Sequence, residues 1–266
     1  RTIGDPTSRL REDPVRMLRA IRFQAKLEFS LEPDLESSIR SLGHLLQDVP
    51  PARLFEEVLK LFLSGYGTAA FDSMIENDIY GWLFPDSKRS MKNNATEELV
   101  RLALTSTDQR IAKQKPVTPA FIYAAVLWYP FIEEKGRLEQ EGEMTYAAAH
   151  EAANNVISKQ QLFTSIPKRF SGPMRDIWFL QSRLPSRFGQ KPDRTMEHKR
   201  FRAAYDFLLL REQAGEKTEQ LGEWWTEYQE ATDERKLAMK QSNSNGRQRK
   251  RKARPKASTN DKASSN

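Results

Sequence analysis

Residues 9–27 read RLREDPVRMLRAIRFQAKL, and the prediction of the fold starts from the pentapeptide EDPVR at residues 12–16. An aspartate directly before a proline is typical of a helix start. Aspartate can accept hydrogen bonds from free backbone N–H groups, and proline fits the first helical turn. We therefore expect Asp13 to be the N-cap, Pro14 the first helical residue and Leu27 roughly the last.

This first helix has two faces. Leu18, Ile21 and Ala25 recur at helical spacing and are expected to pack on a core. Basic side chains form a second face, which could contact phosphates but is more often only solvated. That basic face consists of Arg16, Arg19, Arg22 and Lys26, of which Arg19, Arg22 and Lys26 are the candidates for RNA contact.

The remaining periodic segments are also helical, and runs of alternating β-branched residues are missing, so the sequence predicts an all-α fold. Residues 86–94 are polar and are expected to be a loop, while residues 133–143 are expected to be a linker or a fraying helix end. Further helices are expected at residues 33–46, 52–64, 68–78, 95–105, 119–128, 145–162, 172–184, 193–214 and 218–231. The segment 119–128 is apolar all round, which favours a central, buried helix.

Composition excludes several classes of function. The 266 residues include no Cys, which excludes disulfides, thiolate catalysis and zinc–thiolate sites and fits a reducing cytoplasm. The three histidines, His44, His150 and His198, are far apart and show no metal-ligand spacing. No apolar run approaches the ~20 residues that a membrane-spanning helix needs, and we expect no signal peptide.

The formal net charge of +7 comes from the C-terminal end of the chain. Residues 242–266 hold eight Lys or Arg and one acidic residue, so the rest of the chain is neutral overall. The chain turns polar from about Thr232, and a segment without large apolar residues is expected to be disordered. A basic run of this kind could bind RNA phosphates, or it could be a solubilising or localisation segment. The candidates are Arg247, Arg249, Lys250, Arg251, Lys252, Arg254 and Lys256.

Asp13 and Arg16 together could read the edge of a nucleobase. Adenine presents an amino donor beside a ring-nitrogen acceptor; a carboxylate can accept from the first and a guanidinium can donate to the second. Cytosine presents the same order and guanine and uracil the reverse, so the pair could select A or C over G or U without separating A from C. The alternative is an ordinary ion pair between positions i and i+3 of a helix.

Seven segments, spread along residues 12–206 in the same order, resemble the class II nucleotidyltransferases, which include bacterial poly(A) polymerases and tRNA CCA-adding enzymes. The resemblance is strongest to the poly(A) polymerase branch, in which an arginine- and lysine-rich C-terminus is also typical. The segments are EDPVRMLRAIRFQAKL (12–27), VPPARLFEE (49–57), SGYG (64–67), PAF (119–121), LWYP (127–130), IPKR (166–169) and HKRFRAAYD (198–206).

The resemblance implies an all-α arrangement of neck, body and leg. Residues 1–27 would be the neck segment with the nucleotide-recognition motif, 28–90 the RNA-binding body helices, 91–231 a C-terminal helical domain and 232–266 a disordered Arg/Lys-rich tail. Asp13 and Arg16 would read adenine, and Glu12 would support Arg16 or the geometry of the motif. Arg53 and Glu56 would pair within or between helices to brace the neck.

The resemblance also implies an activity that this sequence could not perform alone. The intact enzyme would be a polynucleotide adenylyltransferase, which adds AMP from ATP to RNA 3′ ends with Mg²⁺. In that family, a Gly-Ser pair and a D-x-D pair of carboxylates in a head domain hold the metal ions, and this sequence has neither. We therefore expect no metal site and no catalytic residue in this chain, a head domain encoded upstream of Arg1, and a chain that is inactive alone. The expected partners are RNA 3′ ends, ATP and the RNA-decay machinery, without a membrane.

Two alternatives remain. A tRNA CCA-adding enzyme shares the first motif but fits the segments after Pro119 and the basic tail less well. A non-enzymatic, helical RNA-binding protein is compatible with the absence of catalytic carboxylates. Large aromatic residues could stack on RNA bases in any of these proteins, although such residues are more often core. They are Trp128, Trp178, Phe179, Trp224 and Trp225.

Overall fold

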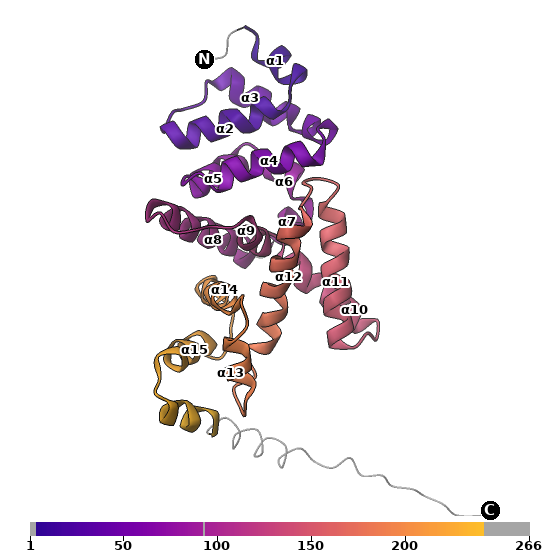
Figure 1. Ribbon diagram of the computed structural model, residues 1–266. Helices are drawn as coiled ribbons and strands as arrows, with labels where there is room; N and C mark the ends of the chain where they lie inside the picture. The colour runs from indigo at the N-terminus through magenta and orange to yellow at the C-terminus, as the bar shows by residue number, and fades with distance from the viewer. Residues whose placement is uncertain (1–3, 93, 242–266) are drawn as a thin grey trace, which may run out of the picture.

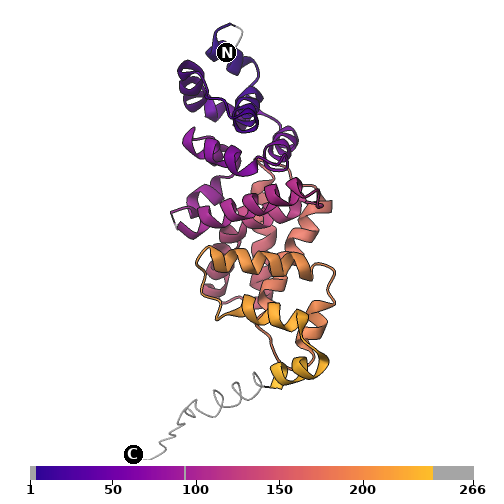
Figure 2. The same ribbon diagram turned by 90° about the vertical axis from the view of Figure 1, so that its left-hand side faces the viewer.

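The computed structural model describes residues 4–92 and 94–241. Over these residues all regular secondary structure is helical, without a β-strand, which confirms the all-α prediction. The helices stack from the N-terminal to the C-terminal end into an elongated body, which Figures 1 and 2 show from two sides. The predicted division at residues 27, 90 and 231 stays a prediction.

Most of the predicted helices are present, with shifted ends. The N-terminal half contains α1 (Pro6–Glu12), α2 (Val15–Leu27), α3 (Pro33–Leu42), the 3-10 helix η1 (Gly43–Asp48), α4 (Pro51–Phe62), α5 (Gly67–Glu76), α6 (Tyr80–Leu83), α7 (Pro85–Ser90) and α8 (Asn94–Ala112). The C-terminal half contains α9 (Pro119–Val126), α10 (Trp128–Gln140), α11 (Thr145–Gln160), α12 (Lys168–Arg183), α13 (Lys191–Met196), α14 (Phe201–Gln213) and α15 (Leu221–Glu230).

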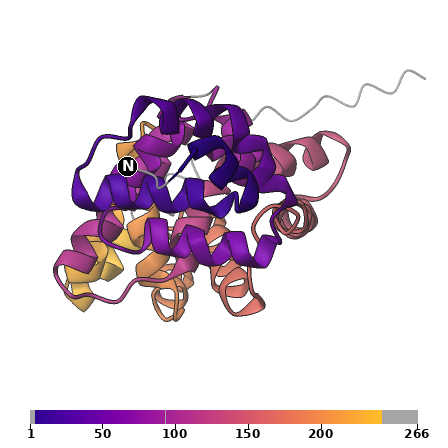
Figure 3. The same ribbon diagram turned by 90° about the horizontal axis from the view of Figure 1, so that it is seen from above.

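The stack has a simple order. α2 packs on α4 and α5, α5 on α8, α8 on α9 and α14, and α14 on α15. The antiparallel pair α10 and α11 lies beside the stack, and α12 packs against both α9 and α14 (Figure 1). Figure 3 looks down the stack from the N-terminal end, where α1, α2 and α3 lie.

The predicted loop at residues 86–94 is wrong, because α7 spans Pro85–Ser90 and α8 begins at Asn94. Pro85 opens the helix α7 and its polar residues are partly internal. The Ser87 side chain is fully buried, and its hydroxyl lies 2.8 Å from the Tyr80 hydroxyl. Polarity alone predicts a loop here because sequence cannot show that these hydroxyls find partners inside the protein.

Of the two alternatives expected for residues 133–143, the linker is wrong over most of the segment, because α10 runs from Trp128 to Gln140 and the segment contains the end of this helix. Pairs of oppositely charged side chains, one helical turn apart, stabilise this helix. Arg137 Nε donates to Glu134 at 2.9 Å, and Lys135 Nζ donates to Glu139 at 2.9 Å. The hydrogen bonds from Arg137 hold the pKa of Glu134 at about 2.

The C-terminal end differs from the prediction in two places. The expected helix 193–214 is interrupted between α13 and α14, and residues 233–241 are helical. In this last segment Met239 is 5% exposed, and Lys240 Nζ donates to Asp193 Oδ2 at 2.8 Å. The predicted disorder from residue 232 is therefore wrong for residues 233–241. Its remainder lies outside the described residues, as do the basic candidates from Arg247 to Lys256.

One apolar core runs through most of the stack, from Leu10 in α1 to Leu210 in α14. The predicted central helix is confirmed, since α9 is buried on nearly every side. A smaller cluster around Trp225 joins α14, α15 and the helical residues that follow. In the part of the chain that the structure describes, the helices are all too short or too polar to span a bilayer.

The segment SGYG at residues 64–67 forms a turn that is closed by a distant carboxylate. Asp108 of α8 accepts hydrogen bonds from the backbone N–H groups of Gly67 at 2.8 Å and Thr68 at 2.9 Å. Gly65 has a φ of +87°, which favours glycine. A Cβ at Gly67 would lie 2.9 Å from the Phe62 carbonyl oxygen, so a larger residue does not fit.

Replacing Asp108 by alanine is expected to lower the free energy of unfolding by about 1–2 kcal/mol, because the free N–H groups at the start of α5 lose their cap. Chemical denaturation measures this change. Asp108→Asn is the matched control, since its amide oxygen can still accept one of the hydrogen bonds, and it should lose less. An alanine variant as stable as the unchanged chain would show that water caps α5 equally well.

Candidate nucleotide and RNA interface

The pentapeptide EDPVR forms the junction between α1 and α2. Asp13 is the C-cap of α1, with φ −146° and ψ 95°, and its backbone N–H donates to the Arg9 carbonyl at 3.4 Å. Pro14 is the N-cap of α2. The predicted N-cap at Asp13 is therefore wrong by one residue: Pro14 already has helical dihedrals (φ −59°, ψ −24°), but the helix begins at Val15, and the Asp13 carboxylate accepts from Arg53 instead of capping α2.

Glu12 holds Arg16 in place, which is one of the two roles that the resemblance implies for it. Arg16 Nη1 donates to Glu12 Oε2 at 3.0 Å and to the Arg9 carbonyl oxygen at 2.9 Å. Arg9 Nη1 donates to the same Glu12 oxygen at 3.1 Å. All of these contacts use Nη1, so within residues 4–92 and 94–241 the Nε and Nη2 groups of Arg16 keep N–H donors for another ligand.

Asp13 is braced by α4 rather than by Arg16. Arg53 Nη2 donates to Asp13 Oδ2 at 3.0 Å, so the ordinary i, i+3 ion pair with Arg16 is replaced by a contact between helices. Arg53 Nη2 is also 2.9 Å from Asp13 Oδ1, but it is not aligned for a hydrogen bond to that atom. Oδ1 is therefore a buried acceptor that lacks a hydrogen bond among the described residues.

The basic face of α2 divides between two environments. Arg19 Nη2 lies 3.9 Å from Glu57 Oε1, which also accepts from Lys60 Nζ at 2.8 Å. Glu57 is 4% exposed and serves as a buried anchor for both cations. Of the expected pairing of Arg53 and Glu56, only Arg53 forms an ion pair, and its partner is Asp13; Glu56 has no ion pair within the described part of the chain.

Arg22 and Lys26 line a groove of about 460 Å³ between α2 and α4. Lys60 of α4 adds a third cation, and Glu56 is the only acidic residue among those that line the groove. The Arg22 guanidinium lies 5.2 Å from the ring centre of Phe23, which is 51% exposed. The sequence predicts Arg22 and Lys26 on one helix, but it does not show that Lys60 and Phe23 share their groove.

The aromatic candidates for base stacking are mostly structural. Trp128, Trp178 and Trp225 are between 0% and 3% exposed, so they are not accessible to RNA. Trp224 is only partly buried, and its ring stacks on Tyr228 with centres 4.6 Å apart. No group of three or more His, Cys, Asp or Glu within the described ranges could hold a metal ion.

Comparisons with known proteins find similarity to poly(A) polymerases along most of the chain. A family model described as "Probable RNA and SrmB- binding site of polymerase A" matches residues 28–91, and one described as "Polymerase A arginine-rich C-terminus" matches residues 141–258. Poly(A) polymerase I of Salmonella typhi is 41% identical over 262 residues, which cover 96% of this chain and 56% of the relative.

The similarity covers more of this chain for the poly(A) polymerases than for the CCA-adding enzymes. Poly(A) polymerase I of Haemophilus influenzae is 42% identical over 89% of this chain and 53% of its own length. A CCA-adding enzyme of Streptococcus pneumoniae is 34% identical over 50% of this chain and 31% of its own. The chain spans about half the length of the poly(A) polymerases that it matches. The chain belongs to the bacterial poly(A) polymerase family.

Proposed function

We propose that this chain is the C-terminal part of a polynucleotide adenylyltransferase and supplies adenine selection and RNA binding to it. The observation that carries the proposal is the α1–α2 junction. There, Asp13 Oδ1 is ion-paired with Arg53 but accepts no hydrogen bond within the described residues, and Arg16 keeps N–H groups beyond those bound to Glu12, so an acceptor and a donor are held by separate anchors. The arrangement matches the amino donor and ring-nitrogen acceptor of adenine.

The chemistry of AMP transfer would come from elsewhere in the enzyme. Mg²⁺ would neutralise charge on the ATP phosphates and activate the 3′ hydroxyl of the RNA. The described residues offer no cluster of carboxylates for it, so this chain is proposed to bind and orient the base while other residues hold the metal. The proposed setting is cytoplasmic RNA, with the RNA-decay machinery as a further partner.

The groove between α2 and α4 is proposed to hold the RNA backbone. Its lining holds three cations, Arg22, Lys26 and Lys60, and one carboxylate, Glu56. Lys60 also pairs with the buried Glu57, so Arg22 and Lys26 supply the excess of positive charge. Phe23 at its edge is half exposed and offers a flat apolar face to a base. A poly(A) polymerase and a CCA-adding enzyme would both need such a groove, and use of CTP by the intact enzyme would favour the second.

Replacing Arg22, Lys26 and Lys60 together by glutamine is expected to weaken single-stranded RNA binding by the chain about tenfold and to reduce the salt dependence. For single strands, log K changes by about 0.7 per phosphate contact for each unit of log salt, so three lost contacts should reduce the slope by about 2. Fluorescence anisotropy with labelled oligoadenylate measures both quantities.

The matched control replaces Lys88, Lys92 and Lys159 by glutamine. These lysines are exposed and lie outside the groove, and the surroundings of Lys159 include the carboxylates of Glu133 and Glu134. The control removes the same charge and should bind RNA nearly as the unchanged chain does. Equal losses in the two variants would mean that only total charge matters and would contradict the groove as the binding site.

A further inference from the structure

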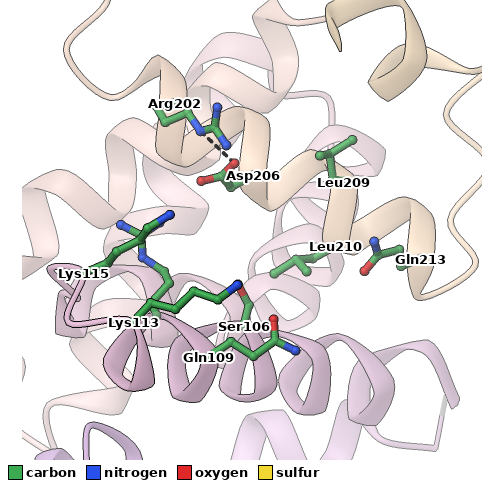
Figure 4. Close-up of a pocket in the computed structure, with 10 residues that line it drawn as sticks. Ser106, Gln109, Lys113, Lys115, Arg202, Asp206, Leu209, Leu210 and Gln213 are labelled. Atoms are coloured by element: carbon green, nitrogen blue, oxygen red, sulfur yellow. Dashed lines mark ion pairs between the residues drawn. The ribbon is translucent and has the colours of Figure 1, made fainter. Parts of the chain in front are cut away.

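A second basic depression lies between α8 and α14, farther along the stack than the groove between α2 and α4 (Figures 1 and 4). It consists of two adjoining hollows of about 210 and 230 Å³, which share the lining residues Ser106, Arg110, Arg202 and Asp206. Figure 4 shows polar side chains of α8 and α14 facing each other across it. The segment that joins α8 to α9 forms one wall.

Positive charge dominates the lining of this depression. Asp206 is the only acidic residue that lines either hollow, and its carboxylate pairs with Arg202 at 3.0 Å. The other five cations have no carboxylate partner among the residues that the structure describes. The cations are Arg110, Lys113, Lys115, Lys199, Arg200 and Arg202.

Two arginines of the depression differ in their hydrogen bonding. Arg110 donates through Nε and Nη2 to the Pro116 carbonyl oxygen at 3.3 and 3.0 Å, which fixes the α8–α9 connection against α8. Arg200 is partly buried, and its Nε is a buried donor without a partner in the described structure. Leaving a buried N–H of a charged group unpaired is costly, and an anion that entered the hollow could accept from it.

Two helix starts add to the preference for an anion. Thr118 caps the N-terminus of α9 by accepting from the Ala120 backbone N–H at 3.4 Å, and Thr118 itself lines the second hollow. α14 begins at Phe201, and residues 199, 200, 202 and 203 line the same hollow. The positive ends of both helix dipoles therefore lie at the depression. They add to the positive charge of the five cations that have no carboxylate partner in the described structure.

Size and shape favour a chain of phosphates over a buried small molecule. The depression is divided into two adjoining hollows of about 210 and 230 Å³, which suits successive groups of a chain better than one enclosed ligand. The lysines are exposed at the rim, as in grooves that track a nucleic-acid backbone. We propose that this depression is a second RNA site, which binds phosphates of single-stranded RNA at a distance from the α1–α2 junction. The proposal rests on the proposed function of the chain as an RNA-binding part.

The test replaces Lys113, Lys115 and Lys199 by glutamine, since all three side chains are exposed and none makes a hydrogen bond to the rest of the described structure. The probe is a labelled single-stranded RNA of about 20 nucleotides, long enough to pass more than one binding surface. Its affinity is expected to fall about tenfold and the salt slope to decrease by about 2. The control is again the replacement of Lys88, Lys92 and Lys159, with thermal melting to verify that each variant is folded.

Each outcome decides a separate point. Binding of RNA by the variant as tightly as by the control would overturn the second site and leave the groove between α2 and α4 unaffected. If the variant loses ATP or inorganic phosphate binding while RNA binding is unchanged, the depression is a nucleotide or anion site and the proposal is wrong. If the unchanged chain itself does not bind RNA, the proposed function fails, and the second site fails with it.

Discussion

Replacing Asp13 by alanine in the complete enzyme is expected to reduce the preference for ATP over GTP by about 100-fold or more. A site that depends on a hydrogen bond rejects a ligand that cannot make it, because the groups of the site are left unpaired. Among the residues that the structure describes, Asp13 Oδ1 at the α1–α2 junction accepts no hydrogen bond. The ratio of kcat/KM for the two nucleotides, measured with an RNA primer, gives the change.

Arg53→Ala is the control for this prediction. It removes the same ion pair, which joins Arg53 Nη2 to Asp13 Oδ2 at 3.0 Å, but it keeps the carboxylate. This variant should be less stable or less active while it retains most of the selection of adenine. If both variants lost selection equally, the position of α4 against the junction would be the important feature, and a direct role of Asp13 would be contradicted.

Replacing Trp178 by alanine is expected to lower the free energy of unfolding of the chain by about 3–5 kcal/mol. The side chain is 1% exposed in α12 and stacks on Phe131 of α10 with ring centres 4.6 Å apart. Its Nε1 donates to the Ala124 carbonyl oxygen of α9 at 3.0 Å. One residue thus joins three helices, and its removal leaves a cavity and an unpaired carbonyl.

Trp178→Phe separates the two contributions. It keeps a ring in the core and loses the indole N–H, so it should cost about 1–3 kcal/mol. Trp224→Ala is the comparison outside the core, because Trp224 is only partly buried, and it should cost less than Trp178→Ala. Urea denaturation of the three variants checks the order. If Trp178→Ala lowered the free energy of unfolding by less than Trp224→Ala, the position of α12 would not depend on this contact.

The helical class and the apolar faces could be predicted from the sequence because they depend on local periodicity. Leu18 and Ile21 are fully buried and Ala25 is 8% exposed, as their spacing predicts. The helix α7 could not be predicted, since its buried Ser87 depends on a hydroxyl partner, Tyr80, seven residues away. Similarly, the helical segment 233–241 depends on the contact of Lys240 with Asp193, which is invisible to local composition.

The candidate site was only partly predictable for the same reason. The roles of Glu12 and Arg16 lie within one turn of helix, and the hydrogen bond between them is 3.0 Å long. The partner of Asp13 is forty residues away in sequence, at Arg53, and the depression between α8 and α14 joins segments still farther apart. Such constellations arise from the packing order of the helices, which periodicity does not specify.

The most direct test of the account is the ratio of adenylate to guanylate that the complete enzyme adds to RNA when ATP and GTP compete. Arg16→Ala is compared with Arg19→Ala, because both remove one arginine from α2, while only Arg16 is held by Glu12 at the α1–α2 junction. We expect Arg16→Ala to lower the ratio sharply and Arg19→Ala to leave it nearly unchanged. An Arg16→Ala enzyme that selects adenine as well as the unchanged enzyme would contradict this expectation.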